Sequence, residues 1–168
     1  MAAEIWSNFV VAANGATALR GCSSALSSPE DRIRFHAYRN SARAIITGGN
    51  TFRGEPYDLT PVPLYVATRD KSTASKNRNP KATFLNLSPE EVIERALEEC
   101  GGPVLVEGGK SFLQPLLDQS FIHRVHVTRT DRDGDDIFWN IDDSLLRYQL
   151  SQVEIVGAER FEIWNIRD

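Results

Sequence analysis

Two short segments of this sequence carry residue types that suit phosphate binding. Residues 46–52 (ITGGNTF) and 106–112 (VEGGKSF) each run from an apolar stretch into a Gly-Gly pair and then into a helix-like stretch. At the carboxyl end of a strand in an open α/β sheet, glycine lets the backbone approach a phosphate, and the following helix presents unpaired N–H groups. Two such strand ends could hold one pyrophosphate. A tight turn is the alternative for each pair, because neither segment matches the GxGxxG or Walker pattern.

A third segment adds a positive charge to the same arrangement. Thr68 and Arg69 directly follow the apolar residues 64–67 (LYVA). A hydroxyl and a guanidinium at the end of a strand suit a phosphate monoester such as the 2′-phosphate of NADP. A lone surface arginine is usually only solvated, so this prediction depends on all three strand ends lying at one edge of the sheet.

One acidic residue, Glu107, stands between an apolar run and Gly108-Gly109. We expect its carboxylate to face a cleft, where it would serve as a general acid. The alternative is that it caps backbone N–H groups of the glycine turn. Both interpretations remain open from the sequence.

Metal chemistry has little support. His123 and His126 are three residues apart on an expected strand, so they point to opposite faces and cannot ligate one ion together. The acidic segment 131–142 has Asp136 where a calcium-binding loop needs glycine at its sixth position. We therefore predict no metal site.

Turn and capping signals indicate the elements that must position these residues. Residues 4–13 read as a strand that stops at Asn14-Gly15. Ser28-Pro29 starts a helix that runs to about residue 40, and residues 88–91 (SPEE) start another with a capping box. Further strands are expected at residues 44–47, 64–67, 104–106 and 121–130, a helix at 111–117, and a hairpin of 149–156 and 160–166. Residues 70–80 are expected to form an exposed polar loop.

This order predicts an α/β fold in three αβα layers, formed by residues 1–168 as a single domain. The expected sheet is mixed and mainly parallel, with about eight strands and an antiparallel C-terminal edge. A chain of 168 residues is too short for two ordinary domains.

Composition limits the partners. A formal charge of −4 gives no basic surface for nucleic acid. The apolar stretches are too short to span a membrane, and the first residues (MAAE) lack the basic start of a signal peptide. Cys22 and Cys100 have no CxxC spacing and read as free thiols. We expect a cytoplasmic protein with a small-molecule ligand.

Six motifs in this order resemble the dihydrofolate reductase superfamily over nearly the whole chain. They are AANG (12–15), SSPEDRIRFHAYRN (27–40), AIITGGNTF (44–52), PLYVATR (63–69), VLVEGGKSFLQPLL (104–117) and VHVTRTD (125–131). The Glu-Gly-Gly form and residues 54–60 (GEPYDLT) look more like the riboflavin-pathway branch, the C-terminal reductase domain of the bifunctional pyrimidine deaminase-reductase. The resemblance implies a dihydrofolate reductase-like fold, NADPH as cofactor, and hydride transfer to a small heterocyclic substrate.

The resemblance also implies a set of site residues. Those expected to bind the cofactor are Ala12, Ala13, Thr47, Gly48, Gly49, Thr51, Thr68, Arg69, Gly108, Gly109, Lys110, Ser111 and Phe112. Within this set, Ala12 and Ala13 match the family position whose backbone contacts the nicotinamide. Asp31 falls near the acid that hydrogen-bonds the pterin in dihydrofolate reductase, although its position at a helix start favours complementing the helix dipole instead. The substrate cleft is expected between Asn14, the helix of Asp31, Glu55 and Glu107.

Three departures from the riboflavin branch concern charge. This chain has Asn8 where that branch carries a lysine, Asn14 where it has aspartate, and Pro61 where an arginine is usual. The resemblance still implies an NADPH-dependent reductase of the pyrimidine type, acting on 5-amino-6-ribosylaminouracil phosphate. The alternatives are a dihydrofolate reductase and a noncatalytic NADP-binding protein. A homodimer is expected, because the branch is commonly dimeric and the C-terminal strands offer an interface.

Overall fold

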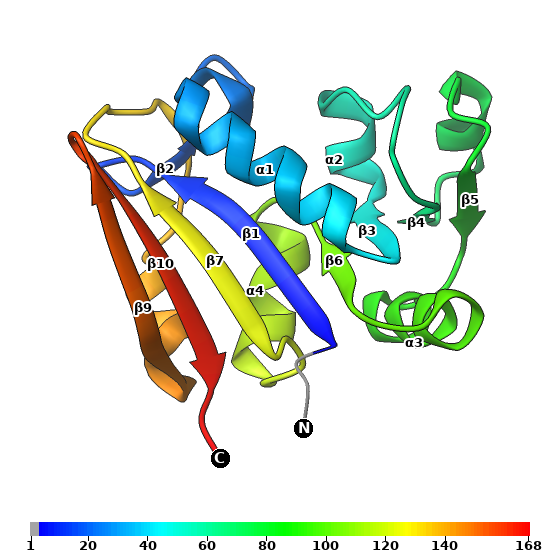
Figure 1. Ribbon diagram of the computed structural model, residues 1–168. Helices are drawn as coiled ribbons and strands as arrows, with labels where there is room; N and C mark the ends of the chain where they lie inside the picture. The colour runs from blue at the N-terminus through cyan, green and yellow to red at the C-terminus, as the bar shows by residue number, and fades with distance from the viewer. Residues whose placement is uncertain (1–3) are drawn as a thin grey trace.

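The computed structural model describes residues 4–168, which form one eight-stranded sheet and the helices around it (Figure 1). Across the sheet the strands are β5 (Ala82–Leu85), β4 (Leu64–Ala67), β3 (Ala44–Gly48), β6 (Val104–Val106), β1 (Ile5–Val11), β7 (Arg124–Arg129), β10 (Glu159–Ile166) and β9 (Tyr148–Val156). Neighbours from β5 to β7 pair in parallel, whereas β10 is antiparallel to both β7 and β9. The predicted mixed sheet with an antiparallel C-terminal edge is therefore confirmed.

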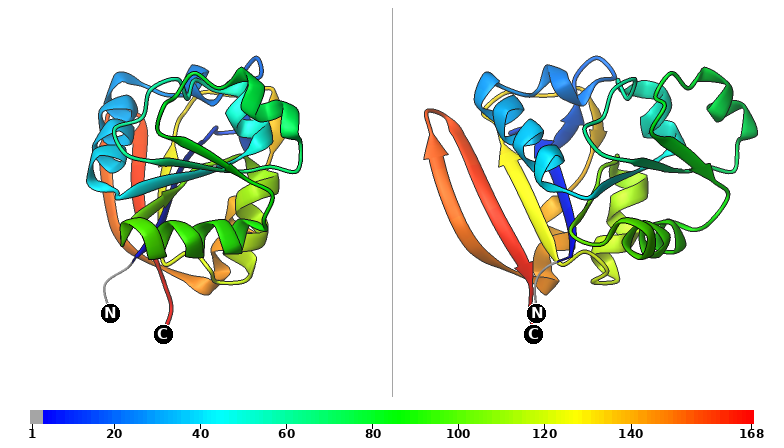
Figure 2. Two further views of the ribbon diagram at one scale, coloured as in Figure 1. Left: turned by 90° about the vertical axis from the view of Figure 1, so that its right-hand side faces the viewer. Right: turned by 45° about the vertical axis from the view of Figure 1, so that its right-hand side comes forward.

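Helices cover both faces of the sheet (Figure 2). Helices α1 (Pro29–Ser41) and α2 (Gly49–Gly54) pack on one face, where Ala42, Phe52 and Leu64 belong to one hydrophobic cluster. Helices α3 (Pro89–Cys100), α4 (Lys110–Asp118) and the short α5 (Ile141–Ser144) pack on the other, in a larger cluster that includes Ile93 and Leu116. This is the three-layer arrangement that the sequence predicts.

Serine caps set the start of the two longest helices. The Ser28 Oγ accepts a hydrogen bond of 3.0 Å from the Asp31 backbone N–H. At α3, the Ser88 Oγ accepts from the Glu91 N–H at 3.2 Å, while the Glu91 carboxylate accepts from the Ser88 N–H at 2.8 Å. Proline follows each cap, as the sequence indicates. Both predicted helix starts are confirmed.

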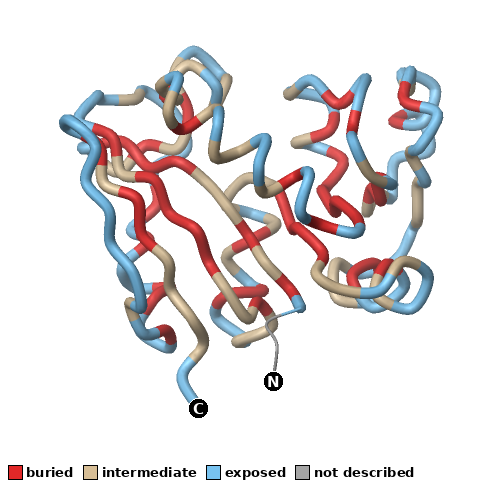
Figure 3. The backbone as a smooth tube through the Cα atoms, in the orientation of Figure 1, coloured by how far each residue is buried: buried red, intermediate tan, exposed pale blue. Residues whose placement is uncertain are grey.

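The inner strands are the most buried part of the chain (Figure 3). Every residue of β3 and β6 is buried, because parallel strands are covered by helices on both faces and are apolar along their length. The outermost strand, β9, is mostly exposed. The core thus lies under the strands whose ends were predicted to carry the ligand.

The structure also contains elements that the sequence did not indicate. Strand β5 extends the sheet, and β2 (Ala16–Ala18) pairs with β8 (Asp136–Phe138) in a small second sheet. Single-turn 3₁₀ helices, η1 (Ser23–Ala25) and η3 (Leu145–Arg147), precede α1 and β9.

The polar segment 70–80 is not simply the exposed loop that was predicted. It forms a 3₁₀ helix, η2 (Lys71–Lys76), and it buries Thr73 and Asn79. The Asn79 Nδ2 donates hydrogen bonds to the Tyr57 carbonyl at 3.0 Å and to the Thr60 Oγ1 at 2.9 Å. A polar side chain is buried here because its hydrogen-bonding groups are satisfied.

Two further findings concern residues 4–168 alone. None of their helices has the length and apolar character needed to cross a membrane. No group of three or more His, Cys, Asp or Glu side chains among them is placed to hold a metal ion.

Candidate functional site

The carboxyl ends of β4, β3 and β6 lie side by side at one edge of the sheet, and a pocket of about 290 Å³ opens there. Seven of the predicted cofactor-binding residues line it: Gly48, Gly49, Thr51, Thr68, Arg69, Ser111 and Phe112. Asn50, Arg53, Ala67 and Asp70 complete the lining. The structure therefore brings the three predicted strand ends together.

Two glycines are required by the close packing of this edge. A Cβ atom on Gly48 would lie 2.8 Å from the Phe112 ring, and one on Gly49 would lie 2.6 Å from the Thr68 Oγ1. Real Cβ atoms do not approach other atoms so closely, so glycine at these two positions lets Phe112 and Thr68 pack directly against the backbone.

Thr51 connects the two glycine turns. Its Oγ1 accepts a hydrogen bond of 3.1 Å from the backbone N–H of Gly109, the residue that precedes α4. The first turn of α4, with Ser111 and Phe112, is thereby held against α2 at the pocket. The amino end of a nine-residue helix carries partial positive charge, which favours an anion.

Two arginines line the pocket. Arg69 is exposed and has no hydrogen-bond or ion-pair partner within residues 4–168, which leaves its guanidinium available. Arg53, which sequence reasoning missed, donates from Nη1 to the Thr73 Oγ1 at 2.6 Å and from Nη2 to the Asn50 Oδ1. The signal that could have found it is its position one helical turn after Gly49, on a helix that starts at a predicted phosphate-binding turn.

Other predicted cofactor residues lie outside the pocket lining. Thr47 is fully buried within β3. Gly108 and Gly109 stand directly before the residues of α4 that line the pocket. The Lys110 Nζ donates a hydrogen bond of 3.1 Å to the Phe138 carbonyl in β8, and Lys110 does not line the pocket.

Ala12 and Ala13 follow β1, on the far side of β6 from the pocket. The Ala12 N–H donates to the Ala16 carbonyl at 2.8 Å, and the Ala13 N–H donates to the Arg132 carbonyl at 2.9 Å. Both backbone donors are therefore used within the protein. A backbone contact to a nicotinamide amide at this position would have to use carbonyl groups.

Glu107 has a different environment from either one predicted. Arg39 of α1 donates from Nε to its Oε1 at 2.8 Å and from Nη2 to its Oε2 at 2.7 Å. The Tyr57 hydroxyl adds a third hydrogen bond, to Oε2 at 2.8 Å. The side chains of Arg39 and Glu107 are only 9% and 5% exposed. The carboxylate thus neither lines the pocket nor caps the glycine turn, but forms a buried ion pair with α1.

The Tyr57 hydroxyl keeps its proton in this cluster. Burial, and then the negative charge of Glu107, raise the pKa of Tyr57 well above its usual value of 10. A protonated hydroxyl donates to the carboxylate, so the three side chains form one satisfied network.

Asp31 is tied to the sheet. Its Oδ1 accepts a hydrogen bond of 2.6 Å from the Thr128 Oγ1 in β7, and its Oδ2 accepts one of 2.6 Å from the Ser27 Oγ. Asp31 is 9% exposed and does not line the pocket. Its backbone N–H completes the cap of α1.

The two remaining predicted substrate residues also have partners. The Glu55 Oε1 accepts from the Ser23 N–H at 2.9 Å and from the Ser23 Oγ at 2.8 Å. The Asn14 Nδ2 donates to the Gly134 carbonyl at 2.8 Å, and its Oδ1 accepts from the Gly134 N–H at 3.1 Å. The Asn14 side chain thus holds the loop after β1 in place, and the Glu55 side chain does the same for the segment after α2.

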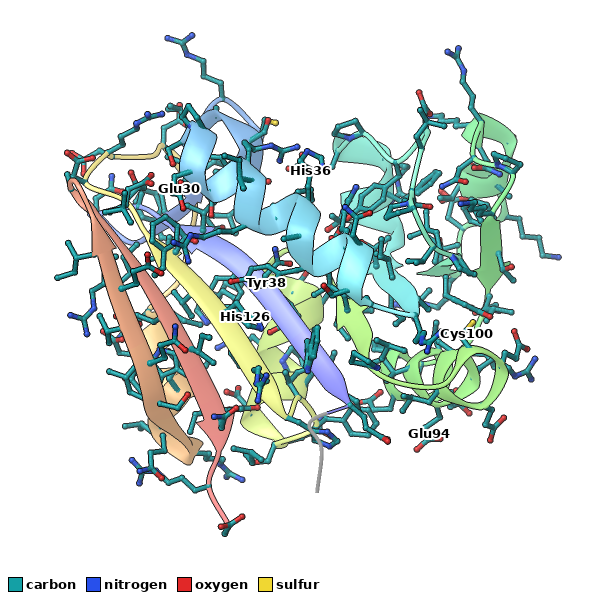
Figure 4. All side chains as sticks on the ribbon, viewed as in Figure 1. Glu30, His36, Tyr38, Glu94, Cys100 and His126 are labelled. Atoms are coloured by element: carbon teal, nitrogen blue, oxygen red, sulfur yellow. The ribbon has the colours of Figure 1, made fainter. Side chains whose placement is uncertain are left out.

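A second cluster of titratable side chains lies between α1 and β7, away from the pocket (Figure 4). The rings of Tyr38 and His126 pack with centroids 4.1 Å apart, and neither ring nitrogen of His126 has a hydrogen-bond partner within residues 4–168. Burial lowers the pKa of His126 to about 4, and the positive charge of Arg124 contributes to the shift. His126 is therefore a neutral core residue.

The sequence matches the model of a protein family, the RibD C-terminal domain, over residues 3–130. A comparison with curated proteins found no significant match.

Solved structures resemble this fold along almost the whole chain. A candidate riboflavin biosynthesis protein from Shewanella sp. PV-4 has a TM-score of 0.75 at 15% identity, over 98% of this chain and 99% of its own. A pyrimidine reductase-like protein from Corynebacterium diphtheriae has a TM-score of 0.74 at 18% identity, over 99% of this chain and 93% of its own.

A third structure belongs to a longer protein. The diaminohydroxyphosphoribosylaminopyrimidine deaminase/5-amino-6-(5-phosphoribosylamino)uracil reductase from Thermotoga maritima has a TM-score of 0.72 at 15% identity. The match covers 98% of this chain but 57% of that protein. At such identities these likenesses establish the fold and leave the activity to be argued from the site.

Proposed function

This chain belongs to the RibD C-terminal domain family, and from that membership we propose that it is an NADPH-dependent reductase. We propose further that its substrate is a small heterocycle of the riboflavin-pathway pyrimidine type, such as 5-amino-6-ribosylaminouracil phosphate. The family match confirms the resemblance to the riboflavin-pathway branch and supports reductase chemistry. The choice of NADPH as cofactor and of a pyrimidine as substrate goes beyond the family match and is part of our proposal.

The pocket at the ends of β4, β3 and β6 carries the cofactor proposal. It combines the glycine turn at Gly48 and Gly49, the amino end of α4, and the unpaired guanidinium of Arg69. A glycine turn at the end of a strand and a helix amino end suit a pyrophosphate, and an arginine suits a 2′-phosphate. These features fit NADPH, which when bound would supply the hydride.

Each group of residues at this edge of the sheet then has a defined role in cofactor binding. Gly48 and Gly49 would form the turn beside the pyrophosphate, and Ser111 at the start of α4 lines the same pocket. Thr68 and Arg69 would bind the 2′-phosphate. Ala12 and Ala13, beyond β6 at the same edge of the sheet, would contact the nicotinamide end of the cofactor.

Asp31 is our candidate for the acid on the substrate side. Its carboxylate accepts hydrogen bonds from two neutral hydroxyls, whereas Glu107 is neutralised by a bidentate arginine. Asn14 and Glu55 lie in the loops that would border the substrate. We expect Asp31→Asn to lower turnover with little effect on NADPH affinity, since the pocket does not include this side chain. Unchanged turnover would assign Asp31 to the cap of α1 alone.

The decisive experiment follows NADPH oxidation with a panel of substrates. We expect turnover with 5-amino-6-ribosylaminouracil phosphate or a closely related pyrimidine. Turnover with dihydrofolate instead would favour a dihydrofolate reductase, an alternative to which the position of Asp31 at the start of α1 points. NADPH binding without turnover on any substrate would favour a noncatalytic NADP-binding protein, an alternative supported by the internal partners of Asn14 and Glu55.

We also propose that the protein acts in the cytoplasm as a homodimer. Both cysteines, Cys22 and Cys100, are free, which agrees with a reducing compartment. The net charge of −4 favours a small-molecule partner over nucleic acid.

A further inference from the structure

We propose that Arg53 determines cofactor specificity: together with Arg69 it binds the 2′-phosphate of NADPH and so selects NADPH over NADH. This inference rests on the proposed function, because it assigns a residue to the cofactor pocket described above. Sequence reasoning assigned that phosphate to Thr68 and Arg69 alone.

The Arg53 guanidinium is held in the pocket by a buried partner. Its Nη1 donates at 2.6 Å to the Oγ1 of Thr73, a residue that is fully buried in η2. The Thr73 Oγ1 is in turn 3.3 Å from the Thr68 Oγ1, at the end of β4. Helix α2 and η2 lie side by side (Figure 2). Arg53 of α2 therefore connects these two elements beside the pocket. A merely solvated arginine would have no such fixed position.

Gly49 leaves the space that this position needs. A Cβ atom on residue 49 would lie 3.1 Å from the Arg53 Nη1 as well as 2.6 Å from the Thr68 Oγ1. Any side chain there would push the guanidinium away from β4. The glycine thus leaves room for the Thr68 hydroxyl and the Arg53 guanidinium to lie together at the proposed charged subsite.

Asp70 is the acid that lines the same pocket, and one of its two oxygens is hydrogen-bonded within the protein. Its Oδ1 accepts from the Ser72 N–H at 2.9 Å and from the Ser72 Oγ at 2.7 Å, and its Oδ2 lies 3.8 Å from the Arg53 Nη1. The hydrogen bonds from Ser72 lower the pKa of Asp70, so it remains an anion.

The charge balance of the pocket therefore favours a phosphate. Two guanidinium groups face one carboxylate, so a single positive charge is left for the ligand. The contact between Arg53 and Asp70 is long, and their side chains are 30% and 54% exposed. A pair of this kind contributes little, so Arg53 can turn to a phosphate at small cost. The bidentate fork of arginine suits that ligand.

The test compares Arg53→Gln, Arg69→Ala and Asp70→Asn with the parent protein. Calorimetry would measure the affinity for NADPH, for NADH, and for the fragments adenosine 2′,5′-bisphosphate and AMP, which differ by the 2′-phosphate. We expect Arg53→Gln to weaken NADPH and the bisphosphate roughly tenfold to a hundredfold, the loss of a hydrogen bond to a charged group, and to spare NADH and AMP. Asp70→Asn should tighten NADPH and the bisphosphate, because it removes a repulsive charge.

Arg43→Gln is the matched control, because Arg43 is another exposed arginine and does not line the pocket. It should leave all four affinities unchanged. Thermal melting would verify that each variant folds, and if Arg53→Gln does not, Arg53→Lys and the independent Asp70→Asn result decide. Equal losses for NADPH and NADH in Arg53→Gln would overturn the role of Arg53 and leave the proposed function standing. A parent protein that binds neither NADPH nor the bisphosphate would overturn both.

Discussion

The ion pair of Arg39 and Glu107 joins helix α1 to the residue that precedes the Gly108-Gly109 turn. Both side chains are buried, and their charged groups depend on each other and on Tyr57 for hydrogen bonds. When one partner of a buried pair is removed, the other is left as an uncompensated buried charge, at a cost of about 3–5 kcal/mol. The pair therefore holds the glycine turn in place relative to α1.

Glu107→Gln should accordingly lower the free energy of unfolding by about 3 kcal/mol, measured by urea denaturation. The double variant Arg39→Met/Glu107→Met removes both charges and keeps most of the volume, so we expect it to be more stable than Glu107→Gln. If Glu107→Gln were as stable as the parent but had lost turnover, Glu107 would return as the candidate proton donor.

The sequence shows why Glu107 is unusual but not what it binds. Its position after three apolar residues and before Gly-Gly indicates an acid in a special place. Its partner Arg39 is 68 residues away and looks like an ordinary residue on a polar helix. Arg53 and Lys110 make the same point, because the direction of a long side chain depends on tertiary neighbours such as Thr73 and the Phe138 carbonyl.

At the scale of elements, helix α1 runs alongside β1 (Figure 1), and Tyr38 of α1 contacts His126 of β7. His126 is 7% exposed, and its ring nitrogens have no hydrogen-bond partner in the described part of the chain. A protonated imidazole there would be a buried charge without a counter-ion, which is why burial lowers the pKa of His126 to about 4.

This contact makes stability depend on pH in a defined window. In the unfolded chain, histidine takes up a proton near its usual pKa of about 6.5, whereas the folded protein resists protonation down to about pH 4. The free energy of unfolding should therefore fall as pH drops from about 6.5 to 4, by about 3 kcal/mol in total, and this contribution is fully present above pH 6.5.

Urea denaturation of the parent and of His126→Phe across this range would measure the effect. The variant keeps an aromatic ring against Tyr38 but has no titrating group, so the difference between the two curves isolates His126. His36→Gln is the control, since His36 lies on the exposed side of α1. Parallel curves for the parent and His126→Phe would show that His126 titrates normally.

Most elements could be predicted because each has a local signal. The caps at Ser28 and Ser88 and the apolar runs of β3, β4 and β6 mark the three-layer fold, and the parallel order then places three strand ends at one edge. Strands β2 and β8 have three residues each, too few for a periodic pattern, and the residues of β8 are exposed. Their pairing depends on tertiary contacts that the sequence does not reveal.

At the scale of the whole molecule, the eight-stranded sheet ends in two edge strands, β5 and β9. Strand β5 has four residues, whereas β9 has nine and is mostly exposed (Figure 3). Val153, Ile155 and Val156 are 39%, 67% and 39% exposed on it, and Leu146, just before it, is 71% exposed. A long edge with unpaired backbone groups and exposed apolar side chains readily pairs with another strand.

We therefore expect the homodimer to form through β9 of two copies, which satisfies the edge by antiparallel pairing around a two-fold axis. Light scattering should give twice the monomer mass for the parent protein. Ile155→Lys should shift the equilibrium to the monomer, because a lysine on an edge strand opposes pairing. Ile33→Lys is the matched control, since Ile33 is 65% exposed but lies on α1. A dimer that survives Ile155→Lys would place the interface elsewhere, and a parent that stays monomeric at high concentration would contradict the homodimer itself.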